Sequence, residues 1–202
     1  MKLFAVYDRD YYCPEEIDSI LADLKTELTH AHIHEKKEIE NYFLNISVLE
    51  KVLTNQIRNK NIRSGLNSQK TTEIATYLEN ITKTKKAEIQ SQYIGRRLDY
   101  YKGNSADSST ISRQAIESFE ELWDNINTRM NIVPGKYTLR MLRSYIQRDY
   151  GVNLTDVQII DEFKVDEIPH DLKNLINDLE TFRTGRVLGE ALTKSEFQIS
   201  TH

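Results

Sequence analysis

The first 35 residues combine two short apolar runs with one amphipathic stretch between them. The run Leu3–Tyr7 is too short for a helix and predicts a buried strand. Pro14 opens a helix whose apolar positions recur at helical spacing to about Glu27 or Thr29. The alternating Ala31–His34 predicts a second strand. Because a strand, a helix and a strand in this order form a βαβ unit, we expect the strands to be parallel and to end at one edge.

From Glu38 onward the spacing of the apolar residues is helical almost throughout. We predict helices at Ile39 to about Asn55, at about Lys70 to Asp99, around Ile116 to Ile126, from Pro134 to Gly151, at Thr155–Phe163 and at Pro169–Thr181. The segment 103–109 is the clearest loop, and the tail 183–202 should be flexible. The expected fold class is α/β, mostly α, with a partial, Rossmann-like parallel sheet and a large helical portion.

These patterns divide the chain into four parts. Residues 1–60 would form the βαβ core, 61–130 a basic helical insertion, 131–182 the C-terminal helices, and 183–202 the tail. Two strands seldom make a stable sheet alone, and no strand precedes the first one. We therefore expect a sheet that is truncated on its N-terminal side.

Composition excludes several classes of protein. No stretch approaches the roughly 20 apolar residues of a membrane span. Asp8 and Asp10 interrupt the start where an export signal would stay apolar. The single Cys13 cannot form an internal disulfide and fits a reducing compartment, so we expect a cytoplasmic protein.

Charge is unevenly distributed although the net charge is only −4. Residues 51–102 hold 11 Lys or Arg against 4 Asp or Glu, whereas both flanking regions are acidic. A local basic patch, and not the net charge, is what a polyanion encounters. The segment could therefore hold a DNA backbone, and the alternative is a solvated helical face.

Acidic residues follow both predicted strands. Asp8 and Asp10 lie just after the first strand, at the edge where open α/β sheets bind ligands. Spaced by one residue, their carboxylates could chelate a hard cation such as Mg²⁺. Glu38 or Glu40, beyond the second strand, could approach the pair. The alternative is that these acids only cap a turn and complement a helix dipole.

Other candidate groups carry weaker signals. His32 and His34 share one face of a strand, but zinc is not expected without a third nitrogen or sulfur ligand, and packing or surface roles fit better. Cys13 has no evident base partner, which argues against a thiol nucleophile. Lys136 follows Gly135 at a helix start, where free amides and a positive charge suit a phosphate or an oxyanion, or form an ordinary cap. A glycine-rich nucleotide loop is absent.

Four segments together resemble the Toprim nuclease half of the OLD (overcoming lysogenisation defect) family over about residues 3–182. They are Val6–Tyr12, Lys37–Leu44, Val133–Lys136 and Asp166–Pro169. Members carry an ATPase domain upstream and use two divalent metals to cut or nick DNA. The resemblance implies a Mg²⁺- or Mn²⁺-dependent DNA endonuclease connected with defence against phage or other foreign DNA.

The resemblance also implies roles for individual residues. Asp8 and Asp10 would be metal ligands, Glu38 or Glu40 a further acidic ligand, and Lys136 the basic residue beside the scissile phosphate. The family's domain begins with a glutamate on a strand that comes before the one leading into Asp8 and Asp10. No such earlier strand is predicted before Leu3–Tyr7 here. We therefore expect a module that is incomplete on its own and depends on an upstream ATPase domain or chain.

Two other functions stay open from the sequence. One is a non-catalytic interaction module that docks on an ATPase partner by strand addition. The other is a phosphotransferase of the haloacid dehalogenase type, with Asp8 as nucleophile and Asp10 as acid, although Tyr12 stands where that motif has Thr or Val. The sequence does not decide whether the chain forms a homo-oligomer.

Overall fold

The computed structural model describes residues 3–102 and 107–185. Along these residues the elements are β1 (Phe4–Tyr7), α1 (Pro14–Glu27), β2 (His30–Ile33), the 3₁₀ helix η1 (Ile39–Phe43), α2 (Ile46–Ser64), α3 (Ile74–Lys83), α4 (Lys86–Tyr100), α5 (Ser108–Asp124), α6 (Ile126–Arg129), α7 (Gly135–Tyr150), α8 (Asp156–Glu162), η2 (Val165–Glu167) and α9 (His170–Thr184). Among the described helices, none has the length and apolar character that crossing a membrane requires.

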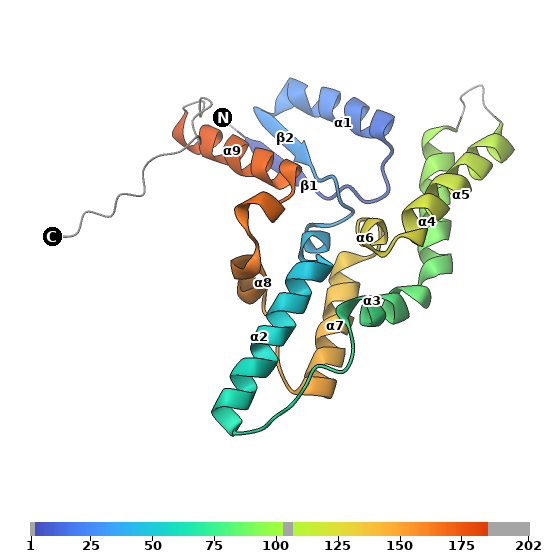
Figure 1. The fold of residues 1–202 in the computed structure, drawn as a ribbon. Helices are drawn as coiled ribbons and strands as arrows, with labels where there is room; N and C mark the ends of the chain where they lie inside the picture. Colours follow the sequence, from blue (N-terminus) through green and yellow to red (C-terminus); the bar gives the residue numbers. More distant parts are fainter. Residues whose placement is uncertain (1–2, 103–106, 186–202) are drawn as a thin grey trace.

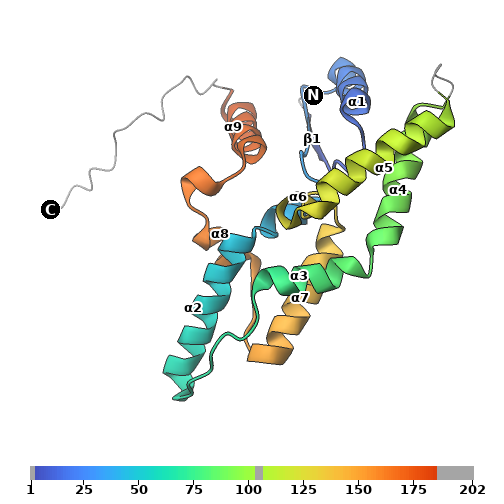
Figure 2. The same ribbon diagram turned by 45° about the vertical axis from the view of Figure 1, so that its right-hand side comes forward.

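The two strands form a parallel pair, as the βαβ pattern predicts. Phe4 lies opposite His30 and Tyr7 opposite Ile33. Helix α1 covers one side of the pair and α9 the other, where the Phe182 ring packs edge-on against Phe4 at 5.5 Å (Figures 1 and 2). The predicted α/β fold with mostly helical content is therefore confirmed.

The hydrophobic core lies among the helices and not around the sheet. Its fully buried members come mainly from α2, α3, α5 and α7, and they include Leu49, Leu53, Leu78, Phe119, Leu142 and Ile146. Figure 2 shows α3 lying across α7. We call this part, from α2 to α8, the helical body. None of the core cluster comes from β1 or β2.

Two predicted helices are wrong because each is divided into two. The stretch from Ile39 to Asn55 begins as η1, and α2 starts only at Ile46, because the Asn45 side chain accepts the Val48 N–H and caps a new helix. The stretch from Lys70 to Asp99 breaks after α3, where the Thr84 hydroxyl donates to the Ile81 carbonyl at 2.9 Å. The break lets α3 pack on α7 while α4 packs on α5.

Proline and glycine residues mark further helix ends, as the sequence predicts. Helix α7 begins at Gly135 after Pro134 and ends at Gly151, whose φ of +61° is the left-handed cap expected there. Helix α9 extends to Thr184, three residues past the predicted end. Most of the predicted loop at 103–109 and the predicted tail beyond 185 lie outside the described residues.

Candidate functional site

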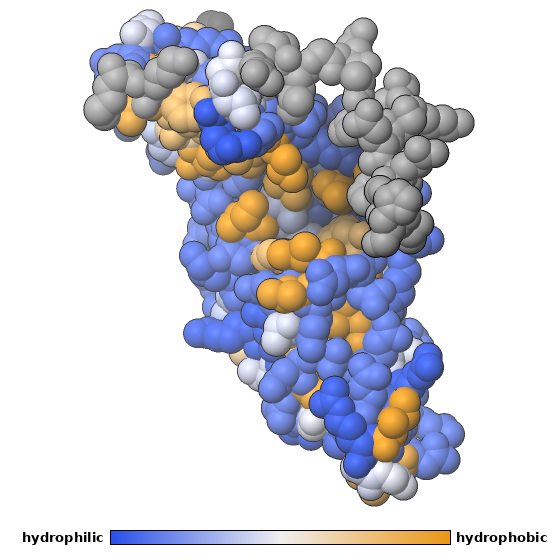
Figure 3. Space-filling model, turned by 90° about the vertical axis from the view of Figure 1, so that its left-hand side faces the viewer, coloured by the Kyte–Doolittle hydropathy of each residue, from blue (hydrophilic) through white to orange (hydrophobic). Residues whose placement is uncertain are grey.

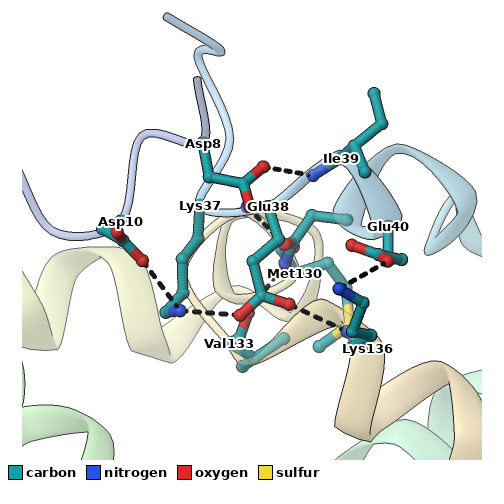
Figure 4. Close-up of polar contacts among 10 residues, drawn as sticks. Asp8, Asp10, Lys37, Glu38, Ile39, Glu40, Met130, Val133 and Lys136 are labelled. Atoms are coloured by element: carbon teal, nitrogen blue, oxygen red, sulfur yellow. Dashed lines mark hydrogen bonds and ion pairs between the residues drawn. The ribbon is translucent and has the colours of Figure 1, made fainter. Parts of the chain in front are cut away.

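The segments that follow β1 and β2 meet at the carboxyl edge of the strand pair. The Asp10 backbone N–H donates to the Lys37 carbonyl at 2.9 Å, which fixes one segment against the other. Asp10 has a φ of +48°, a left-handed conformation that Asp tolerates better than most residues. This turn aims the Asp10 carboxylate at the Lys37 side chain (Figure 4).

Lys37, which the sequence did not single out, lies between two of the predicted acidic residues. Its ammonium is 2.7 Å from Glu38 Oε1 and 3.5 Å from Asp10 Oδ1, and it also lies 5.1 Å from the centre of the Tyr11 ring. The side chain is buried, and a buried ammonium requires such partners. Lys37 therefore balances the negative charge of this edge.

Glu38 connects the edge to the start of α7. Its Oε2 accepts the backbone N–H of Lys136 at 3.0 Å. The N-terminus of α7, predicted from the sequence to suit a phosphate, is therefore bound by a carboxylate of the protein itself. Burial by itself would raise the pKa of Glu38. The hydrogen bonds from Lys136 and Lys37 and the charges of both lysines outweigh burial, and the pKa lies below its usual value.

The two remaining acids lie on either side of Glu38. Asp8 Oδ1 accepts the Ile39 N–H at 3.1 Å, which is the capping role considered as its alternative. Glu40 Oε1 is 3.5 Å from the Lys136 ammonium, whose side chain is 79% exposed. All five residues predicted from the sequence thus border this edge, with the Lys136 ammonium beside the Glu40 carboxylate (Figure 4).

Asn41 joins this edge to the helical body. Its fully buried side chain donates to the carbonyls of Met130 and Val133 at 2.7 and 2.8 Å, and it accepts the Glu38 N–H at 2.9 Å. A Cβ on Gly135 would lie only 2.5 Å from Asn41 Oδ1. The glycine of the Pro-Gly-Lys start therefore has a packing reason, because it lets the helix approach Asn41.

The donors at this edge are all carboxylate oxygens, which suits a hard divalent ion such as Mg²⁺ or Mn²⁺. The Lys37 ammonium shows that the space between Asp10 and Glu38 can hold a positive charge, because a cation already lies there. Mg²⁺ commonly uses only one or two carboxylates and takes its other ligands from water and phosphate. Among the described residues, however, Asp8, Asp10, Glu38 and Glu40 do not bring three carboxylate oxygens within 4.8 Å of one another. The edge therefore offers such an ion the carboxylates of Asp10 and Glu38, between which the Lys37 ammonium now lies.

A groove of about 760 Å³ runs from this edge along α7. Glu40 and Lys136 line its near end, and Arg140, Arg143 and Arg148 follow along the helix. Arg143 and Arg148 pair with neighbouring carboxylates, whereas the Arg140 guanidinium lies 5.8 Å from the Tyr137 ring. The spacing of these cations on α7 was present in the sequence but was overlooked beside the more basic 51–102 segment.

The basic 51–102 segment is more neutralised than its composition suggests. Its cations with carboxylate partners are Lys51, Lys70, Lys85, Lys86 and Arg96. Arg97 instead donates to the Tyr11 carbonyl at 2.6 Å. Much of this charge therefore supports contacts between helices.

A second cluster lies on the α9 side of the same edge. His32, His34 and Asp171 offer ligand atoms that all lie within 4.8 Å of one another. The sequence showed the two histidines but no third ligand, because Asp171 lies far along the chain, in the first turn of α9. Only the packing of α9 against the sheet brings it there.

A scan against protein-family models, a search of curated proteins and a search of solved structures each found no match to this chain. The chemistry of the sheet edge and of the α7 groove therefore carries the functional argument.

Proposed function

We propose that this chain is the nuclease module of a metal-dependent DNA endonuclease that resembles the OLD family and hydrolyses phosphodiester bonds. One observation carries the proposal. Glu40, one of the four acids at the edge, lines the near end of the cationic groove of α7 together with Lys136, whose ammonium is 3.5 Å from Glu40 Oε1. A DNA backbone lying in the groove would bring a phosphate beside the carboxylates.

The residues at the junction would share the work of hydrolysis. Asp8 and Asp10, with Glu38 or Glu40, would hold Mg²⁺ or Mn²⁺, which when bound supplies Lewis-acid activation of water and phosphate. Lys136 is exposed and would offset charge that develops on the phosphate oxygens. Lys37 would release Asp10 and Glu38 by moving its ammonium out of the space between them.

The groove would hold DNA through its backbone and not through base edges. Lys136, Arg140, Arg143 and Arg148 give it four cations, against the carboxylates of Glu40 and Asp156. Contacts from Arg and Lys to phosphates carry no sequence information and depend strongly on salt. We therefore expect binding that is insensitive to sequence.

A partner chain with an ATPase domain belongs to the proposal. Among the described residues the sheet has two strands, and Val6 and Tyr7 of β1 are 42% and 43% exposed. An exposed strand edge of this kind is a template for a strand from another chain. The partner's strand would complete the sheet and bring the further acidic ligand that the resemblance implies.

Plasmid nicking tests the nuclease function. We expect the 202-residue chain alone to nick supercoiled DNA weakly or not at all with Mg²⁺ or Mn²⁺, and to nick it when an upstream ATPase polypeptide is supplied. Asp8→Ala should abolish the restored nicking, whereas Asp18→Ala, which removes an exposed carboxylate on α1, should leave it intact. Equal nicking by the Asp8→Ala complex would overturn the assignment of this edge.

DNA binding distinguishes the groove from the 51–102 segment. Arg140→Ala should weaken binding to a labelled duplex and lower the slope of log K against log salt by about one. Arg63→Ala removes an exposed cation at the end of α2 and should change neither quantity. The reverse result would move the DNA contact from α7 to the basic segment.

A non-catalytic docking module is the second candidate, because an apolar groove lies beside the acidic edge. Ile39, Phe43, Ile160, Phe163 and Ile176 line it, and Figure 3 shows apolar side chains gathered on this face. A partner that binds here without nicking DNA, and with unchanged affinity for the Asp8→Ala chain, would favour this function.

A further inference from the structure

The cluster of His32, His34 and Asp171 has features that neither packing nor the proposed nuclease chemistry explains. The two imidazole rings are 5.3 Å apart, and the carboxylate comes from α9, on a different element. His34 is 3% exposed and Asp171 5% exposed, so both lie away from water. His32 is partly buried beside them. Burial of an imidazole and a carboxylate at one point is costly unless something compensates for it.

Each of the three side chains has a buried atom without a hydrogen-bond partner. These atoms are His32 Nε2, His34 Nδ1 and Asp171 Oδ1. Buried polar atoms in folded proteins nearly always have partners, and an unpartnered one points to a missing water or ion. Here three unpartnered atoms belong to the three residues whose ligand atoms lie within 4.8 Å of one another. An ion bound at this point would satisfy all of them.

The surroundings of Asp171 orient it as a metal ligand requires. The buried Tyr42 hydroxyl donates to Asp171 Oδ2, and the Glu35 backbone N–H donates to the same oxygen at 3.2 Å. Both hydrogen bonds go to one carboxylate oxygen and leave Oδ1 free. Hydrogen bonds of this kind, which hold a ligating carboxylate in place, are typical of metal sites.

We propose that His32, His34 and Asp171 bind a divalent first-row transition metal, with Zn²⁺ as the ion best suited to them. Two imidazole nitrogens and one carboxylate oxygen form a set that Zn²⁺ uses, whereas Mg²⁺ prefers oxygen ligands alone. Zn–N bonds of about 2.0–2.1 Å place neighbouring ligand atoms about 3.3 Å apart, so a small inward movement completes the site. This centre is chemically distinct from the all-carboxylate edge.

An ion bound by His32, His34 and Asp171 would link α9 to strand β2. Only Asp171 and Leu175 of α9 are buried, and Ile176 on the same helix is 57% exposed. A helix that buries so little apolar surface gains little attachment from packing. A metal shared between β2 and the first turn of α9 would supply the missing attachment, and would hold the helix that forms one wall of the apolar groove.

Metal titration of the full chain tests this proposal. After treatment with a chelator, we expect the chain to bind one Zn²⁺ by calorimetry, and Co²⁺ in its place to give a visible absorption spectrum. His34→Ala and Asp171→Asn should each abolish this binding. His170→Ala, which removes the exposed neighbouring histidine, should keep it. Circular dichroism of each metal-free variant checks that the fold persists.

Two further readouts separate a metal site from a merely buried cluster. Tyr42→Phe removes only the hydroxyl that holds Asp171 and should weaken Zn²⁺ binding about 10- to 100-fold. Zn²⁺ should also slow amide hydrogen exchange in α9 but not in α2. Equal Zn²⁺ binding by the wild-type, His34→Ala and Asp171→Asn chains, or no binding by any, would overturn the proposal.

Discussion

The helical body and the strand pair are stabilised in different ways. In the body, Leu49, Phe119 and Leu142 are completely buried, whereas Val6 and Tyr7 of β1 are more than 40% exposed. Full burial of one such side chain contributes about 1.5–3 kcal/mol, so the body has enough apolar contacts to hold itself. The strand pair depends instead on the two helices that cover it, α1 and α9, and on polar links such as Asn41 between its edge and the body. The difference teaches that the residues proposed for catalysis lie on the part of the chain with the fewer buried apolar contacts.

The largest expected effect comes from the same substitution made in both regions. Leu142→Ala leaves a cavity in the body and should lower the free energy of unfolding by about 2–5 kcal/mol. Leu3→Ala changes a residue that is 43% exposed and should lower it by no more than about 0.5 kcal/mol. Urea denaturation followed by circular dichroism measures both. Similar losses for the two variants would show that the strand pair is as well packed as the body.

The joint between the two regions should be the next most sensitive place. In Gly135→Ala the new Cβ would lie 2.5 Å from Asn41 Oδ1 and 2.8 Å from its backbone nitrogen, so backbone must shift. We expect a loss of about 1–3 kcal/mol in the free energy of unfolding. Gly95→Ala is the matched control, because nothing lies within 4 Å of its Cβ and the residue is inside α4. That variant should gain about 0.5–1 kcal/mol.

The smallest effect concerns the charge at the edge. The pKa of Glu38 in the folded chain lies below its ordinary value of 4.5, so folding favours the ionised carboxylate. This contribution is fully present above pH 4.5 and is lost as the pH falls through the lower folded-state pKa. Glu38→Gln should therefore lose less stability than the wild type as the pH falls from 6 to below 4.5. A wild type and variant with parallel pH profiles would contradict the stated pKa shift.

Local signals in the sequence determined much of the fold. The short run at Leu3–Tyr7, Pro14 and the alternation at Ala31–His34 were sufficient for the parallel pair, and Gly151 marked the end of α7. The division after α3 was not predictable in the same way. It depends on which neighbouring helices α3 and α4 pack against, and apolar spacing within one segment does not specify that.

Some residues of the candidate sites could be predicted from the sequence, and others could not. The acids near the edge follow from where parallel strands end, so sequence spacing predicted their position. Lys136 was singled out by its helix start, and it reaches the edge because α7 packs against η1. Lys37 and Asp171 were missed because their importance comes from contacts. The partner of Lys37 on the other segment is Asp10, and Asp171 reaches His34 only through the docking of α9. Residues defined by tertiary contact carry no local pattern by which to find them.

The Lys37 ammonium between Asp10 and Glu38 makes this edge self-neutralising. A tethered cation does not dilute, so its effective concentration at the carboxylates stays high in any buffer. The negative cluster can therefore assemble during folding before any divalent ion arrives, without strong repulsion among its members. Under the proposed function a divalent ion would have to displace the Lys37 ammonium, and its apparent affinity would include the free energy of that displacement.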